Sequence, residues 1–344
     1  MTERTLIIAE AGVNHNGDIE IAKALVDAAV AAGADLVKFQ TFSADRLVTH
    51  NSKKADYQLK TTDCDQSHYE MLSQLELSDS MHEELFRYCN VKKIGFFSTG
   101  FDIQSVDYLY SQGLRVFKIP SGEITNLPYL RHIGALGVDI IISTGMSTLG
   151  EIESALQVLL DVGADRERIT VLLCTSKYPT PMQDVNLRSM RNIGSCFNLK
   201  FGYSDHTAGI EVAIAAVALG ATIIEKHFTL DKTMDGPDHR ASLEPDELSD
   251  MVTAIRNIEK ALGDGVKRVS LEEKSNLKVA RKFIVANKNI KAGEVFSSEN
   301  LTTMRSNGGI SPMEWDNVLG KCADRDLQKH EPVTLNGFHL KLEN

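Results

Sequence analysis

The sequence has no long apolar segment and no excess of basic residues, and each absence excludes a class of protein. No window approaches the apolar length of a membrane span. The N-terminal residues pass directly into the apolar run Leu6–Ala9 without a cleavage pattern, so we expect a first strand and no signal peptide. The net charge of -10 argues against a surface for nucleic acid or anionic membranes. A local pocket on an acidic protein can still be basic, so an anionic small substrate stays open.

Cysteine is also scarce, and no two cysteines form a C-x-x-C pair. An odd, scattered set fits reduced thiols in the cytosol better than a disulfide framework or a zinc knuckle. We therefore expect a soluble cytoplasmic protein. The five cysteines are Cys64, Cys89, Cys174, Cys196 and Cys322.

What is present is a repeated unit of a short apolar strand, a polar turn and an amphipathic helix, which runs to about Gly263. At 344 residues, with 42% hydrophobic and 24% charged residues, the chain has room for one large globular domain and a small one. Eight such units predict a closed (β/α)8 barrel, a TIM barrel. An open doubly wound sheet is the rival, but no Gly-x-Gly-x-x-Gly follows the first strand. The expected strands are Leu6–Glu10, Leu36–Gln40, Gly95–Thr99, Val116–Ile119, Ile140–Ser143, Thr170–Cys174, Lys200–Tyr203 and Thr222–His227.

The carboxyl ends of these strands are unusually polar. In such a barrel the active site lies at that edge, so the end groups predict one ring-shaped polar site. The polar groups at the strand ends are Glu10, Lys38, Gln40, Ser98, Thr99, Lys118, Ser121, Glu123, Ser143, Thr144, Thr175, Ser176, Lys177, Tyr178, Ser204, Asp205, His206, Glu225, Lys226 and His227.

Two histidines, His206 and His227, end adjacent expected strands. Alone, each would more often be a hydrogen-bonded structural residue. Together at the functional edge they favour an open metal site, since imidazole suits Mn, Fe, Co or Zn and two nitrogens leave room for water and substrate. His15, on the first βα loop, either lines this site or caps the turn.

Two lysines, Lys38 and Lys118, stand inside apolar strands, where an unpaired ammonium is costly. One interpretation is a structural ion pair with Glu10. Another is a cradle for phosphate or carboxylate, and a third is a Schiff-base lysine. In the eighth βα loop, Asp238 either binds a polyol or is a turn residue. The hydroxyls that would complete an anion cradle are those of Thr99, Ser121, Ser143 and Ser204.

Two segments depart from the barrel rhythm. The connection from about Ser43 to Leu77 is too long for a tight turn, and its amphipathic pattern favours a lid over disordered decoration. After Gly263, the charged run Lys267–Lys274 predicts a linker helix, and short β-like pieces follow. We therefore expect a barrel domain over 1–265, a linker over 266–282 and a small domain over 283–344.

Seven linked motifs follow one another along the chain. They are Ile8-Ala9-Glu10-Ala11-Gly12-Val13-Asn14-His15-Asn16-Gly17, Val37-Lys38-Phe39-Gln40-Thr41, Phe117-Lys118-Ile119-Pro120-Ser121-Gly122-Glu123, Gly202-Tyr203-Ser204-Asp205-His206-Thr207, Ile224-Glu225-Lys226-His227-Phe228-Thr229-Leu230, Gly236-Pro237-Asp238-His239 and Gly309-Ile310-Ser311-Pro312-Met313. In this order the motifs resemble the sialic acid synthase family, whose members make nonulosonic acids. The resemblance covers essentially the whole chain.

The resemblance implies a barrel followed by an antifreeze-like (SAF) domain, and a domain-swapped homodimer. It implies that phosphoenolpyruvate condenses with an open-chain 2-acetamido sugar of the mannose series, with Mn or Mg assisting. His206 and His227 would be the metal ligands, and Glu10 would lie between the metal and the reacting atoms. The residues that would hold phosphoenolpyruvate are Lys38, Thr99, Lys118, Ser121, Ser143 and Ser204. Those that would contact the sugar are Gln40, Glu123, Tyr178, Asp238 and Arg305, the last from the partner subunit.

The sequence departs from the family pattern at two loops, with Gly100 in place of a usual proline and Ser306-Asn307-Gly308 after Arg305. The segments Tyr57–Thr62 and Ile124–Leu130 resemble the legionaminic acid branch. The resemblance therefore favours a 2,4-diacetamido-2,4,6-trideoxy sugar and N,N'-diacetyllegionaminate as product. N-acetylneuraminate and pseudaminic acid synthases are the alternatives. For the water that adds during the reaction, Glu10 is the expected base, with Glu123 or a metal-bound hydroxide as alternatives.

Overall fold

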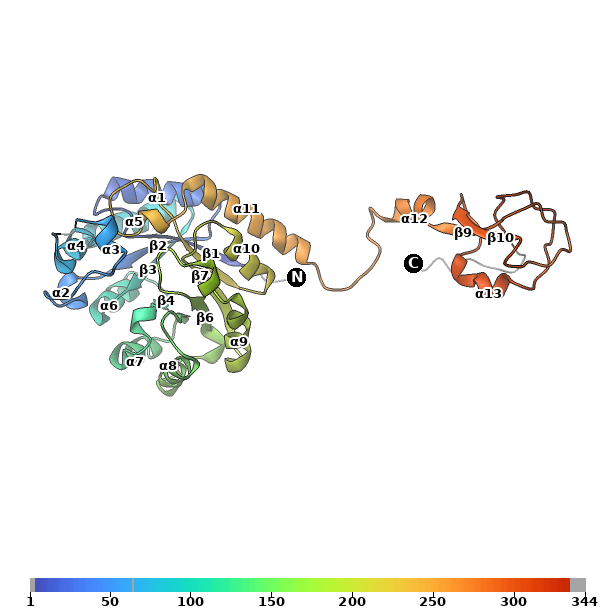
Figure 1. The fold of residues 1–344 in the computed structure, drawn as a ribbon. Coiled ribbons are helices and arrows are strands. Elements are labelled where there is room, and N and C mark those ends of the chain that lie inside the picture. Colours follow the sequence, from blue (N-terminus) through green and yellow to red (C-terminus); the bar gives the residue numbers. More distant parts are fainter. Residues whose placement is uncertain (1–3, 64, 335–344) are drawn as a thin grey trace. The chain divides into compact units, whose positions relative to one another are not determined.

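In the computed structural model, which describes residues 4–63 and 65–334, eight parallel strands form one ring (Figure 1). The hydrogen-bonded order is β3-β2-β1-β8-β7-β6-β5-β4, and β3 lies against β4. This is the (β/α)8 barrel that the repeated unit predicts, and the open doubly wound alternative is wrong. The strands are β1 Leu6–Gly12, β2 Leu36–Thr41, β3 Gly95–Gly100, β4 Val116–Ile119, β5 Asp139–Ser143, β6 Ile169–Cys174, β7 Lys200–Asp205 and β8 Ile223–His227.

Helices surround the ring, and their ends follow from local sequence signals. In α1, the Asp18 side chain accepts hydrogen bonds from two backbone N–H groups of the first turn, and Gly33 ends the helix at a φ of 78°. In α8, Thr148 and Glu151 form a reciprocal capping box. The helices of the barrel unit are α1 Ile19–Ala32, α2 Ala44–Leu47, α3 Gln58–Thr61, α4 His68–Gln74, α5 Asp79–Lys92, α6 Ile103–Ser111, α7 Leu127–Gly134, α8 Leu149–Asp161, α9 Leu187–Phe197, α10 Glu211–Ala218 and α11 Pro245–Leu262.

The connection between β2 and α5 has a small core of its own, and Cys64 within it lies outside the described residues. It carries the short helices α2, α3 and α4, and its apolar side chains pack together with Val13 from the first βα loop. This core holds the segment at the carboxyl ends of the strands. Its buried members are Val13, Phe42, Ala44, Met71, Leu72 and Leu75.

The chain divides into two compact units, residues 1–264 and 265–344. The second unit has the antiparallel pair β9 (Lys282–Ala286) and β10 (Leu301–Arg305), with the helices α12 (Lys274–Ala280) and α13 (Trp315–Val318). The end of the expected small domain, residues 335–344, lies outside the described residues.

The expected linker helix over Lys267–Lys274 is wrong, because a helix begins only at Lys274. Residues 264–273 are all exposed, so this charged run has no buried face on which a helix could be stabilised.

Candidate active site

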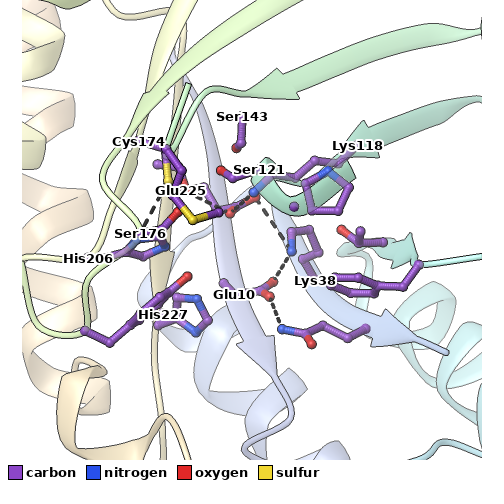
Figure 2. Close-up of a pocket in the computed structure, with 18 residues that line it drawn as sticks. Glu10, Lys38, Lys118, Ser121, Ser143, Cys174, Ser176, His206, Glu225 and His227 are labelled. Atoms are coloured by element: carbon purple, nitrogen blue, oxygen red, sulfur yellow. Dashed lines mark hydrogen bonds and ion pairs between the residues drawn. The ribbon is translucent and has the colours of Figure 1, made fainter. Parts of the chain in front are cut away.

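A pocket of about 250 Å³ opens at the carboxyl ends of the barrel strands (Figure 2). Its walls come from strands across the ring, and they bring together groups that are far apart in the sequence. The lining residues are Glu10, Lys38, Gln40, Thr99, Phe101, Lys118, Pro120, Ser121, Gly122, Ser143, Met146, Cys174, Ser176, Tyr178, Ser204, His206, Glu225 and His227.

Two buried lysines and two buried carboxylates lie at the centre of this pocket (Figure 2). Lys38 Nζ lies 2.6 Å from Glu10 Oε2 and 3.7 Å from Glu225 Oε2. Lys118 Nζ donates to Glu225 Oε1. The ion pair between Lys38 and Glu10 that the sequence left open is therefore present, and both lysines still line the pocket.

The two carboxyl groups differ in acidity because their neighbours differ. Burial raises the pKa of Glu10 to about 7, against the lowering effect of the Lys38 charge. Burial also acts on Glu225, but Lys118 and Lys38 outweigh it and hold the pKa of that carboxyl well below its usual range. Burial alone would lower the pKa of Lys38, but the carboxylates of Glu10 and Glu225 raise it by more. The pKa of Lys38 is therefore above its usual value, and Lys38 is a cation.

Hydroxyls surround the lysines. Within residues 4–63 and 65–334, Thr99 Oγ1 and Ser143 Oγ are buried and have no hydrogen-bond partner. Ser204 Oγ donates to Glu225 Oε1 at 3.1 Å. Buried polar atoms are normally paired, so the hydroxyls of Thr99 and Ser143 are available to donate to an anion in the pocket.

Close backbone packing brings one more hydroxyl to this wall. Gly145 N donates to Ser121 Oγ at 3.0 Å. A Cβ at Gly145 would meet Ser176 Oγ at 2.2 Å and Ser121 Oγ at 2.8 Å, so only glycine fits there.

The two histidines face each other across the seam between β7 and β8, with ring centroids 5.5 Å apart. His206 Nδ1 donates to the Thr175 carbonyl at 2.8 Å, which leaves Nε2 as a lone-pair donor. Burial lowers the pKa of His227 well below its usual value, so this ring is neutral. Its Nδ1 has no hydrogen-bond partner among the described residues.

Burial lowers the pKa of His206, while Cys174 and the Thr175 carbonyl raise it, with a net rise, so a metal ion would compete with a proton for His206 Nε2. That atom and a nitrogen of the neutral His227 ring fit an open divalent-metal site. In the described part of the chain, no group of three or more histidine, cysteine or acidic side chains is placed to hold a metal ion. A closed structural site is therefore absent from these residues, and His206 and His227 would be the protein ligands.

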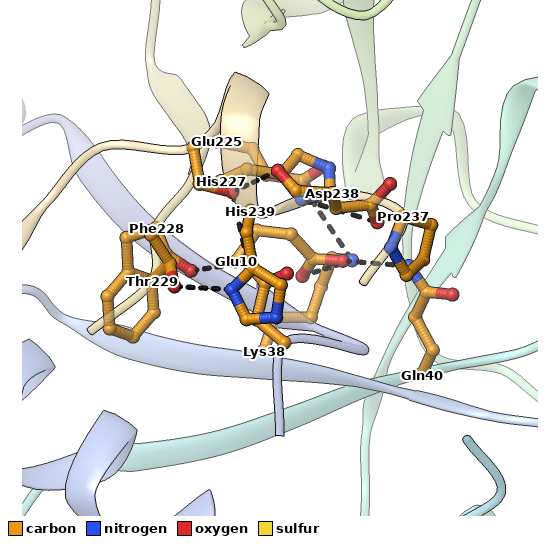
Figure 3. Close-up of polar contacts among 12 residues, drawn as sticks. Glu10, Lys38, Gln40, Glu225, His227, Phe228, Thr229, Pro237, Asp238 and His239 are labelled. Carbon is orange, nitrogen blue, oxygen red and sulfur yellow. Dashed lines mark hydrogen bonds and ion pairs between the residues drawn. The ribbon is translucent and has the colours of Figure 1, made fainter. Parts of the chain in front are cut away.

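Aromatic and acidic groups lie beside the histidines. The ring of Tyr178 lies 4.1 Å from that of His206, and Tyr57, just before α3, stacks on Tyr178 at 5.1 Å. Asp238 Oδ2 lies 4.0 Å from His227 Nδ1 (Figure 3), and burial raises the pKa of Asp238 to about 6. Tyr178 lines the pocket, whereas Asp238, also predicted to contact the sugar, does not and lies behind His227.

The remaining predicted site residues are placed differently. Gln40 lines the pocket, and its Nε2 donates to Glu10 Oε1 at 3.3 Å (Figure 3). Glu123 does not line it and accepts from Asn126 Nδ2 at 2.5 Å. Arg305 is exposed at the end of β10, in the second unit. His15 is fully buried and accepts from Gly17 N at 2.9 Å, which agrees with a turn-capping role.

The sequence reasoning missed the part that Glu225 plays. It placed this carboxylate among the strand-end groups but gave it no function. The structure makes Glu225 the partner of Lys118, Lys38 and Ser204. An acidic residue within the apolar strand β8 was the available signal, since such a residue needs a buried cation.

The chain is similar to known proteins over nearly its whole length. Residues 25–267 match the model of the NeuB family, and residues 281–338 match that of the SAF domain. The chain is 54% identical to an N,N'-diacetyllegionaminic acid synthase from Campylobacter jejuni, over 96% of this chain and 99% of that protein. It is 46% identical to a protein of the same name from Legionella pneumophila, over 93% and 91%.

The crystal structure of an N-acetylneuraminic acid synthetase from Leptospira borgpetersenii, in complex with citrate, is similar with a TM-score of 0.71. It is 32% identical and the match covers 80% of this chain and 91% of that one. The family-model matches fall one on each unit, and the NeuB match spans the strands that carry Lys38 and Lys118 and the two histidines. The chain therefore belongs to the NeuB family and carries a SAF domain at its C-terminal side.

Proposed function

We propose that this chain is a phosphoenolpyruvate-dependent nonulosonic acid synthase that makes N,N'-diacetyllegionaminate. The sugar substrate is then an open-chain 2,4-diacetamido-2,4,6-trideoxy mannose-type aldehyde. The names of the relatives from Campylobacter jejuni and Legionella pneumophila support this product over N-acetylneuraminate, since the chain resembles them more than the Leptospira synthetase.

One observation carries the proposal: two buried lysines and unpaired buried hydroxyls converge on a single pocket. Lys38 and Lys118 supply charge, while Thr99 and Ser143 supply directed donors. This combination suits a compact substrate with a phosphate and a carboxylate. It holds phosphoenolpyruvate in one orientation, which lowers the entropy cost of reacting with a second substrate.

A divalent ion, Mn or Mg, would be held by His206 and His227, next to this cradle. When bound, it supplies Lewis-acid polarisation of the sugar aldehyde. His206 is prepared for this by its hydrogen bond to the Thr175 carbonyl, which fixes its tautomer. Tyr178 and Asp238 lie beside the same two rings and would orient the sugar.

The reaction forms a bond from C3 of phosphoenolpyruvate to the aldehyde carbon, whose oxygen takes up a proton. Water adds at C2 and loses a proton, and the bond from C2 to the phosphate oxygen breaks, so inorganic phosphate leaves. Glu10, with a pKa of about 7 and a place beside Lys38, is the group best suited to hold that proton.

We further propose a domain-swapped homodimer in which the SAF domain of one subunit presents Arg305 to the sugar bound by its partner. The exposed guanidinium at the end of β10 is free to meet such a ligand. In the described residues, no helix is long and apolar enough to cross a membrane. Phosphoenolpyruvate is a cytoplasmic metabolite, which supports a cytoplasmic enzyme.

The test is phosphate release by the purified chain with phosphoenolpyruvate, Mn²⁺ and a panel of sugars. The panel contains the 2,4-diacetamido sugar, N-acetylmannosamine and the sugar precursor of pseudaminic acid. We expect kcat/KM to be highest with the first, and mass spectrometry to find the diacetylated product. Preference for another sugar would reassign the product, and no phosphate release with any sugar would reject the function.

Two controls test the chemistry. Phosphoenolpyruvate labelled with ¹⁸O in the bridging oxygen should release labelled phosphate, because the bond that breaks is C–O. A Schiff-base aldolase, the alternative for Lys118, would instead be trapped on a lysine by borohydride and would tolerate a chelator. His206→Ala should remove activity while the far-UV circular dichroism spectrum is retained.

A further inference from the structure

A second buried ion pair lies behind the two histidines, outside the pocket. Lys226 Nζ is 2.9 Å from Asp205 Oδ2, and both side chains are fully buried. Successive side chains of a strand point to opposite faces. Ser204 and Glu225 line the pocket, so their neighbours Asp205 and Lys226 point to the outer face of the barrel, and neither lines the pocket.

This pair joins the ends of the two strands that carry the histidines. Asp205 and Lys226 are register partners in the pairing of β7 with β8. His206 follows Asp205 directly, and His227 follows Lys226. A change in the distance between Asp205 and Lys226 therefore moves the two imidazoles relative to each other.

The pair also holds the turn that follows His206. Asp205 Oδ1 accepts from Thr207 N at 2.8 Å and from Thr207 Oγ1 at 2.7 Å, and Lys226 Nζ donates to the Thr207 carbonyl at 2.5 Å. The carbonyl of His206 itself accepts from Thr180 N at 2.8 Å. His206 is thus fixed by contacts from the residues on both of its sides.

Stability alone does not account for this arrangement, because burying two charges costs free energy that a well-packed apolar pair would not. We propose that Asp205 and Lys226 are positioning residues that fix the spacing and orientation of His206 and His227, and so set the affinity for the divalent ion. This inference rests on the metal role of the histidines in the proposed function. Outer groups that orient metal ligands commonly change affinity 10- to 100-fold when removed.

The test is Mn²⁺ binding to the full chain without substrates, followed by the electron paramagnetic resonance signal of free Mn²⁺. The variant is D205N/K226M, which removes both charges and keeps an acceptor for Thr207. We expect its Mn²⁺ dissociation constant to rise roughly 10- to 100-fold. Urea unfolding of each protein without metal gives its stability separately.

The matched control is D35N/R256M. Arg256 Nη2 lies 2.7 Å from Asp35 Oδ2, and this oxygen also accepts from Ile7 N, so this ion pair likewise holds a backbone N–H group. It is less buried than the first pair, and its two members also contact Arg4 and Glu259. Asp35 precedes β2, away from the carboxyl ends of the strands, and neither residue lines the pocket. We expect a loss of stability and a dissociation constant for Mn²⁺ within about twofold of the unmodified chain.

Equal Mn²⁺ affinity in D205N/K226M and the unmodified chain would overturn the inference and leave the proposed metal site intact. Failure of the unmodified chain to bind Mn²⁺ would overturn both. Should D205N/K226M not fold, Thr207→Val replaces it, since it removes one donor to Asp205. A severalfold weaker binding of Mn²⁺ is then expected, and unchanged binding rejects the inference.

Discussion

At the scale of single residues, the pocket assigns different protonation states to two carboxyl groups that share the same lysines. Glu225 is held ionised by Lys118 and Lys38, while burial brings the pKa of Glu10 to about 7. Groups with separated pKa values in one site commonly divide the acid and base roles. Glu10 is therefore the residue where loss of the carboxyl should affect the chemical step most.

Glu10→Gln should lower kcat about 10²- to 10⁴-fold, the usual range for a general acid or base, with a much smaller change in the KM for phosphoenolpyruvate. Steady-state phosphate release measures both. Glu123→Gln, for which we expect a raised sugar KM, provides the comparison. A larger loss of kcat in Glu123→Gln than in Glu10→Gln would move the proton-handling role to Glu123.

His15 should make the barrel sensitive to acid. Burial lowers its pKa to about 4, and Nδ1 accepts from Gly17 N, so protonation breaks this hydrogen bond. As the pH falls below 6.5, His15 binds a proton in the unfolded chain but stays neutral in the folded chain until the pH approaches 4. The free energy of unfolding therefore falls with the pH, by about 2 kcal/mol from this residue between pH 7 and 5.

His15→Asn keeps an acceptor for Gly17 and removes the titration. The free energy of unfolding of each protein is measured in urea by far-UV circular dichroism at pH 7 and at pH 5. The decrease between these pH values should be about 2 kcal/mol smaller for His15→Asn than for the unmodified chain. Parallel pH profiles of the two proteins would show that His15 is not the group responsible.

At the scale of elements, the connection between β2 and α5 contacts Tyr178 and the loop before Asp238, the residues proposed to orient the sugar. Tyr57 stacks on Tyr178, and Thr61 Oγ1 donates to the Pro237 carbonyl at 3.3 Å, one residue before Asp238. The small core under α4 anchors the segment. These contacts agree with the expected lid and connect it to Tyr178 rather than to the buried lysines, which is the side where we propose that the sugar binds.

Tyr57→Ala should raise the sugar KM between about twofold and tenfold, the equivalent of one aromatic pair, and leave the phosphoenolpyruvate KM unchanged. Tyr57→Phe, which keeps the ring, should behave like the unmodified chain. If Tyr57→Ala changed both KM values equally, the segment would act on the whole pocket and not on the sugar side.

The strands of the barrel were largely predictable, because a short apolar run in the sequence marks each of them locally. The strand β4 has the predicted bounds, and every other barrel strand differs from its prediction by at most two residues at one end. Contacts that depend on register were not predictable: Lys118 and Glu225 are 107 positions apart and meet only when the ring closes. The linker helix was misplaced because charge periodicity does not show whether a helix has a surface to pack on.

At the scale of the whole molecule, each of the two units has a main hydrophobic core of its own. The barrel core draws all its buried members from residues 7–255, and the second core draws its own from residues 284–333. The single tryptophan, Trp315, packs against the second core. Its fluorescence therefore reports on the small unit, while far-UV circular dichroism is dominated by the helices of the barrel.

We expect the two signals to change at different urea concentrations, with the tryptophan transition first, since a small core stabilises less. Measuring both on the same samples of the full chain makes the comparison direct. Coincident transitions would show that the two units unfold as one.

When Glu10 is ionised, the two lysines and two carboxylates at the centre of the pocket carry no net charge. The binding of an anion should therefore change the protonation of the pocket. Phosphoenolpyruvate brings further negative charge next to Glu10 and raises the pKa of that carboxyl above 7. Binding near neutral pH should then draw a proton from the buffer. Glu10 is about half protonated at pH 7 before binding, so the uptake there is at most about half a proton. Calorimetric titrations at pH 7 in buffers of different ionisation enthalpy should give apparent binding enthalpies on a line whose slope approaches about half a proton, and Glu10→Gln should flatten that line.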